Sequence, residues 1–144
     1  MKKGKNILLL IGAILCLFPL CSHMQDLIYY TFFSIRDLPT DIMFQFFVST
    51  LVTGLFVAHS LILLTRNLKN AGGRILPLIG IVMNGVGLIL SILSVISVLP
   101  QFLILNEMHL IGLQYIITML PGFVEIAAHI LLLIGCIYSL PRKN

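Results

Sequence analysis

Four long apolar stretches, separated by shorter polar ones, set the pattern along the chain. They cover residues 7–28, 42–64, 75–99 and 121–140. Each reaches the roughly 20 residues that an α-helix needs to cross about 30 Å of hydrocarbon. The first stretch becomes more polar toward its end, where Tyr29 and Tyr30 are typical of an interface. The pattern predicts an all-α fold, an integral membrane four-helix bundle.

Several prolines lie near the expected ends of these helices. Pro100 predicts the end of the third helix, and Pro121 the start of the fourth, because a proline in the first turn costs no backbone bond. Pro19 predicts a kink or an end in the first helix. We expect residues 23–41 and 101–120 to lie along the outer interface, although 101–120 could instead extend the fourth helix beyond Pro121.

Composition supports a membrane class. Hydrophobic residues make up 59% of the chain and charged residues 10%, against about 25% charged residues in ordinary soluble domains. The length of 144 residues suits a single domain over 1–144. Basic residues sit in short flanks rather than along one face, so a nucleic-acid partner is not expected.

The distribution of charge predicts the topology. Eight of the nine basic residues flank one side of the predicted spans: Lys2, Lys3, Lys5, Arg66, Lys69, Arg74, Arg142 and Lys143. The other side carries Arg36 with Asp26, Asp37, Asp41 and Glu107. Because cytoplasmic flanks collect Lys and Arg, we expect both termini in the cytoplasm and the protein in the plasma membrane.

A cleaved signal peptide is the alternative for the first stretch, given its basic start and apolar centre. Cleavage requires small residues just before the cut, and Pro19 and Cys21 fit that pattern poorly. We therefore expect the first stretch to stay as a membrane anchor.

Two ionisable side chains interrupt the fourth stretch. Counted at 1.5 Å per residue from Pro121, Glu125 lies about 6 Å and His129 about 12 Å below the outer boundary of the hydrocarbon. The spacing of four residues places both on one helix face. Exposure of either to lipid would cost several kcal/mol, so we expect this face to point into the bundle or a hydrated cavity.

The third stretch offers a matching face of small and polar residues, spaced by four and three: Gly80, Asn84, Gly87, Ser91 and Ser94. If the third and fourth helices are antiparallel neighbours, one register pairs Gly122 with Ser94, Glu125 with Ser91, His129 with Gly87, Leu132 with Asn84 and Cys136 with Gly80. In this register large side chains tend to face small ones, which allows close approach of the third and fourth helices. A second polar face, on the first helix, combines Gly12, Cys16, Pro19 and His23.

The sequence thus predicts an intramembrane polar cluster of Glu125, His129, Asn84, Ser91 and His59. His59 is placed about 7 Å from the cytoplasmic boundary, apart in depth from His129, so a compact metal site is not expected. The three cysteines show no CxxC spacing, which disfavours a redox enzyme. No catalytic residue and no cofactor is predicted.

Three functions are compatible with these features. The first is an accessory or interaction subunit, whose partner is a membrane protein or a second copy of the chain in the lipid bilayer. The second is a proton- or ion-coupled transporter that uses Glu125 and His129. The third is a membrane-embedded enzyme, for which HExxH, GxSxG and phosphate-binding loop motifs are all missing from the sequence. We expect the interaction subunit.

Overall fold

The computed structural model describes residues 2–32, 40–71, 73–107 and 113–141, and these fold into helices without strands. The helices are α1 (Lys2–Phe32), α2 (Thr40–Leu68), α3 (Ile75–Glu107) and α4 (Leu113–Ser139). Each described helix contains a segment long and apolar enough to cross a membrane. The prediction of an all-α chain with four such helices is therefore confirmed.

The helix ends differ from the prediction at the prolines. α3 continues through Pro100 to Glu107, and α4 begins at Leu113, before Pro121. The predicted boundaries at these prolines were wrong, and the alternative that part of 101–120 extends the fourth helix is confirmed. Residues 23–32 are helical as part of α1, and their expected position along the interface stays a prediction. An apolar segment has few partners for its backbone other than itself, so continued helix outweighs the one bond that a proline removes.

Pro19 likewise lies inside α1 and does not end it. The connections 33–39 and 108–112 lie outside the described residues, so the expectation of interfacial segments there is untested.

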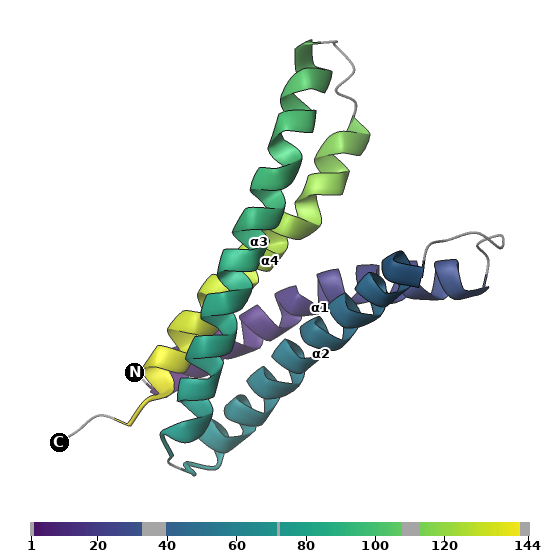
Figure 1. Cartoon of the computed structure of the whole chain (residues 1–144). Coiled ribbons are helices and arrows are strands. Elements are labelled where there is room, and N and C mark those ends of the chain that lie inside the picture. The colour runs from purple at the N-terminus through teal and green to yellow at the C-terminus, as the bar shows by residue number, and fades with distance from the viewer. Residues whose placement is uncertain (1, 33–39, 72, 108–112, 142–144) are drawn as a thin grey trace.

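The helices form two antiparallel hairpins, α1 with α2 and α3 with α4 (Figure 1). The hairpins are joined mainly through α1 and α4, whereas α2 makes few contacts with α3 or α4. In Figure 1 they lie close together at the end that holds both termini and the α2–α3 turn, and they diverge toward the other end. We call these the closed end and the open end.

Reciprocal contacts at two glycines bring α1 and α4 together. A Cβ at position 12 would lie 2.7 Å from Leu132 Cγ, and one at position 135 would lie 2.9 Å from Leu9 Cγ. Leu9 and Leu132 are completely buried. Each leucine thus occupies the space that a side chain on the facing helix would need, which permits close packing of the two backbones.

The buried apolar core is small and follows this contact. Its members on α1, α2 and α4 are Leu9, Ala13, Cys16, Phe56, Val57, Leu63, Ala128, Leu132 and Cys136. Only 17–28% of each apolar span is buried inside the molecule, and most large apolar side chains point outward. Such a surface suits lipid far better than water.

A defined turn ends α2 at the closed end. Asn70 has a φ of 53°, in the left-handed region that asparagine tolerates better than most residues. The Ala71 amide donates to the Arg66 carbonyl at 3.0 Å, and the Asn70 amide donates to the Asn67 carbonyl at 3.2 Å. This pair of bonds is the Schellman arrangement, which folds the chain back over the last turn of the helix.

The packing of α1 on α4 predicts that Gly12→Leu destabilises the protein. The new side chain would overlap Leu132, and overpacking of this kind costs about 1–3 kcal/mol. Thermal or denaturant unfolding in mild detergent measures the loss. Gly4→Leu is the matched control on the same helix, since a Cβ there meets no described atom within 4 Å. Equal unfolding midpoints for the two variants would contradict the proposed contact.

Candidate functional site

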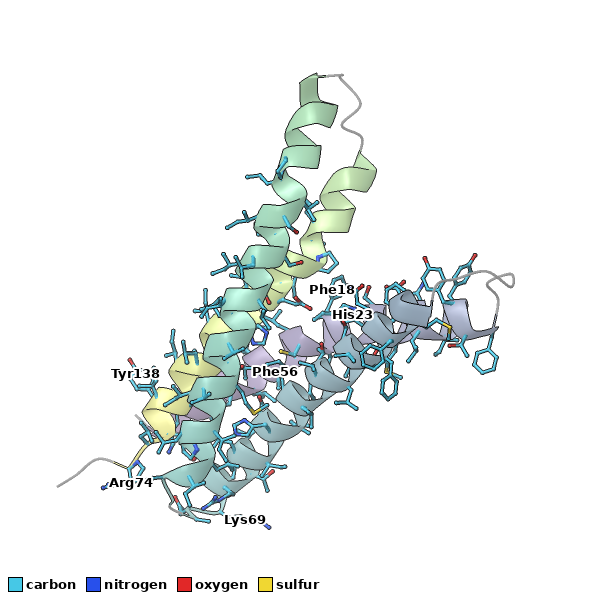
Figure 2. The ribbon with its side chains drawn as sticks, in the orientation of Figure 1. Phe18, His23, Phe56, Lys69, Arg74 and Tyr138 are labelled. Carbon is cyan, nitrogen blue, oxygen red and sulfur yellow. The ribbon has the colours of Figure 1, made fainter. Side chains whose placement is uncertain are left out.

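A polar cleft lies where the two hairpins diverge. Its volume is about 310 Å³, and all four helices contribute to its walls. The polar and ionisable side chains that line it are His23, Gln45, Ser49, Thr53, Ser91, Ser94, Glu125 and His129. Figure 2 shows His23 on α1, near the point of divergence. We refer to this cavity as the cleft.

Glu125 connects α4 with both α3 and α1 inside the cleft. Ser91 Oγ donates to Glu125 Oε2 at 3.3 Å, and His23 Nε2 lies 3.4 Å from Glu125 Oε1. The side chains of His23 and Glu125 are 27% and 23% exposed. The predicted contact between Glu125 and Ser91 is therefore present. The carboxyl group faces the cleft, so it is less buried than the prediction of a bundle-facing residue implies.

His129 forms the floor of the cleft. Its ring lies over Gly87, where a Cβ would be 2.6 Å from His129 Cε1, and it meets the Phe56 ring edge-on at a centroid distance of 4.5 Å. Nδ1 lies 3.1 Å from Asn84 Oδ1. An amide oxygen can only accept, so this contact places a hydrogen on Nδ1. The imidazole is buried, as predicted.

The polar contacts continue from His129 toward the closed end. Asn84, which is completely buried, donates from Nδ2 to the Gly80 carbonyl at 2.8 Å. The His59 ring contacts the position that a Cβ on Gly80 would occupy. His59 Nε2 donates to the Leu76 carbonyl at 3.0 Å, and its Nδ1 has no hydrogen-bond partner among the described residues. Each residue of the predicted cluster therefore contacts a neighbouring helix: His59 contacts α3, and Asn84 and Ser91 of α3 bond to His129 and Glu125 of α4.

The predicted register between α3 and α4 is found in part. Three of its pairs are in contact: Glu125 with Ser91, His129 with Gly87, and Cys136 with Gly80. Gly122 instead faces Val95, one residue from the predicted Ser94. Leu132 packs on Gly12 of α1, and its pairing with Asn84 stays a prediction. α4 is covered on two sides, by α1 and by α3, so the residues of its packing face contact both helices.

Two features were missed at the level of sequence. His23 was placed on a polar face of the first helix, but its pairing with Glu125 requires the α1–α4 contact. At the closed end, Asn67 donates to Ser139 Oγ at 2.9 Å and accepts from Lys5 Nζ at 3.4 Å. The sequence signal for this second group is that Lys5, Asn67 and Ser139 each lie near the same end of their predicted helices.

The described residues contain no group of three His, Cys, Asp or Glu side chains that could hold a metal ion. Cys16, Cys21 and Cys136 are free thiols in the described structure. The chemistry that the cleft offers is hydrogen bonding and proton exchange through two imidazoles and a carboxyl group.

Comparison of the chain with protein-family models, with curated proteins and with solved structures finds no match. The function is therefore inferred from the geometry of the cleft and from the surface around it.

The position of His129 predicts the effect of filling the space above Gly87. Gly87→Leu should displace the imidazole from Asn84 and destabilise the α3–α4 hairpin by about 1–3 kcal/mol. Gly85→Leu, on the same helix, is the control, because no described atom lies within 4 Å of a Cβ there. Unfolding in detergent gives the stability, and the NMR shifts of the His129 ring report its displacement. An unchanged His129 signal in Gly87→Leu would refute the contact.

Proposed function

We propose that this chain is a multi-pass integral membrane protein that acts as an interaction subunit of a membrane complex. Its four helices cross the bilayer, both termini face the cytoplasm, and a transmembrane helix of a partner protein lies against the cleft. The abundance of exposed apolar side chains supports insertion, and the basic residues near the closed end support the orientation.

The partly exposed pair of His23 and Glu125 carries this proposal, with 27% and 23% of the two side chains exposed. An ionisable group that faces hydrocarbon costs several kcal/mol, so the open side of the cleft requires water or polar groups from another molecule. Gln45 and Ser94 are also exposed on the cleft walls. A partner helix with polar side chains at this depth would satisfy these groups, since interhelical hydrogen bonds stabilise association in membranes.

The arrangement of the hairpins provides access for such a helix. α2 and α3 make few contacts with each other, so neither closes the cleft on that side. The cavity of about 310 Å³ is too small to enclose a helix but accommodates several side chains from one helix face. The partner therefore packs across the gap between α2 and α3.

A second candidate function is proton conduction, which the arrangement of polar residues favours. From the cleft toward the closed end lie the His23–Glu125 pair, the His129–Asn84 pair, and His59 beside Gly80. Nε2 of His59 donates to a carbonyl, so its unpartnered Nδ1 is available to accept a proton. Proton relays in membrane proteins use Asp, Glu and His side chains in this way.

The interaction function predicts contact between the partner and the cleft. When Ser94 is replaced by a photoreactive amino acid that carries a diazirine group, illumination should crosslink the chain to the transmembrane segment of a second protein. Mass spectrometry of the crosslinked peptide identifies that protein. Ser97 is the matched control, because it is an exposed serine on the same helix and is not among the described cleft residues. Crosslinks to lipid alone from both positions would contradict the proposal, whereas a crosslink to the same chain would identify the partner as a second copy.

Glu125→Gln separates the two functions, since glutamine keeps the shape and hydrogen-bonding capacity of glutamate without its titratable proton. For an interaction subunit, the variant should fold and crosslink as the unmodified chain does. For a proton conductor, it should abolish the dissipation of a proton gradient in liposomes that contain the purified chain. Gradient dissipation by the unmodified chain and its loss in Glu125→Gln, with no partner crosslink, would replace the first proposal by the second.

A further inference from the structure

We propose that the closed end of the molecule contains a binding site for a phosphate group, separate from the cleft. A cavity of about 320 Å³ lies there between the start of α1, the end of α2, the α2–α3 turn and the end of α4. This volume falls within the range of about 300–1,000 Å³ that is usual for small-ligand sites. The phosphate belongs either to a phospholipid headgroup or to a soluble phosphate compound.

The charge of the cavity selects an anion. Lys5 and Arg66 line it, and its described lining contains no Asp or Glu. Across the sequence, none of the five acidic residues belongs to the segments that meet at this end: they are Asp26, Asp37, Asp41, Glu107 and Glu125. Lys69 and Arg74 add positive charge near the α2–α3 turn (Figure 2). An anion in the cavity is therefore attracted by several cations and meets no acidic group in its described wall.

Hydrogen bonds hold the polar wall of this cavity in place. Asn67 lies between Lys5 and Ser139, accepting from the ammonium at 3.4 Å and donating to the hydroxyl at 2.9 Å. Ser139 Oγ in turn donates to the Gly135 carbonyl at 2.7 Å. These bonds link α1, α2 and α4. The ammonium has three hydrogens and the bond to Asn67 uses one, so Lys5 can donate to a ligand without leaving Asn67.

The α2–α3 turn positions the second cation. The left-handed Asn70 folds the turn back over the last turn of α2, which carries Arg66. Gly73 then leaves space for the guanidinium, because a Cβ at that position would lie 2.5 Å from Arg66 Nη2. The planar guanidinium presents paired donors that match the oxygens of a phosphate.

The remaining wall is apolar and includes Leu63, Pro77 and Leu140. A site with two cations, amide groups and an apolar side fits the phosphate and glycerol region of an anionic phospholipid. Basic cavities between transmembrane helices commonly hold such headgroups. If both termini are cytoplasmic, the cavity lies at the level of the inner-leaflet headgroups.

Lipid retention tests the site. The purified full chain is equilibrated in micelles with equal amounts of phosphatidylglycerol and phosphatidylcholine, and native mass spectrometry measures the lipid that stays bound. We expect preferential retention of phosphatidylglycerol, reduced about tenfold in Lys5→Gln and in Arg66→Gln, because hydrogen bonds to charged groups are strong. Gly73→Ala should also reduce retention, without changing the net charge, by displacing the guanidinium.

Lys69→Gln is the control, since it removes the same charge at the same end from a residue outside the described lining of the cavity. Circular dichroism and size-exclusion profiles verify that each variant folds. A titration with inorganic phosphate distinguishes the two sources: competition with retained lipid indicates that a soluble phosphate can occupy the site, and its absence assigns the site to lipid. Equal retention of both lipids together with no phosphate binding, or an equal loss in Lys69→Gln and Arg66→Gln, would overturn the proposal.

Discussion

The close approach of α4 to its two neighbours holds the molecule together. On one side, Leu9 and Leu132 fill the spaces above Gly135 and Gly12; on the other, His129 and Cys136 lie over glycines of α3. Helices in lipid gain little from burying apolar surface against one another, so such contacts depend on dispersion at short range and on polar bonds. Without α4, the described contacts leave α1 and α2 joined to α3 only through the weak association of α2 with α3.

This dependence on α4 also explains where the polar groups lie. Glu125 and His129 belong to the helix that contacts both neighbours, so their partners come from different hairpins: His23 from α1, and Ser91 and Asn84 from α3. The bonds from Ser91 and Asn84 hold the α3–α4 hairpin together, and the bond from His23 joins that hairpin to α1. Of these residues, His23, Ser91, Glu125 and His129 also line the cleft, because the hairpins diverge just beyond this junction.

Sequence pattern predicted the helices and much of the α3–α4 contact. The lengths of the apolar stretches identify four helices, and the three-four spacing of small and polar residues pairs Glu125 with Ser91 and His129 with Gly87. The prolines are a poor guide to the helix ends, because an apolar backbone satisfies its hydrogen bonds only by staying helical, so α3 and α4 continue through Pro100 and Pro121.

The partners of Leu132 and His23 could not be predicted for a different reason. α4 contacts both α1 and α3, and the spacing of residues in the sequence does not indicate that Leu132 packs on Gly12 of α1. The bond from His23 to Glu125 joins residues 102 positions apart. It depends on how the two hairpins cross, which is decided by packing at the glycines and not by any local pattern.

The divergence of the hairpins gives the molecule a wedge shape (Figure 1). In the proposed membrane arrangement, this shape would occupy more area in the leaflet at the open end than in the leaflet at the closed end. The cleft lies where the hairpins diverge, so its width, and with it the exposure of Glu125, depends on the angle between the two hairpins.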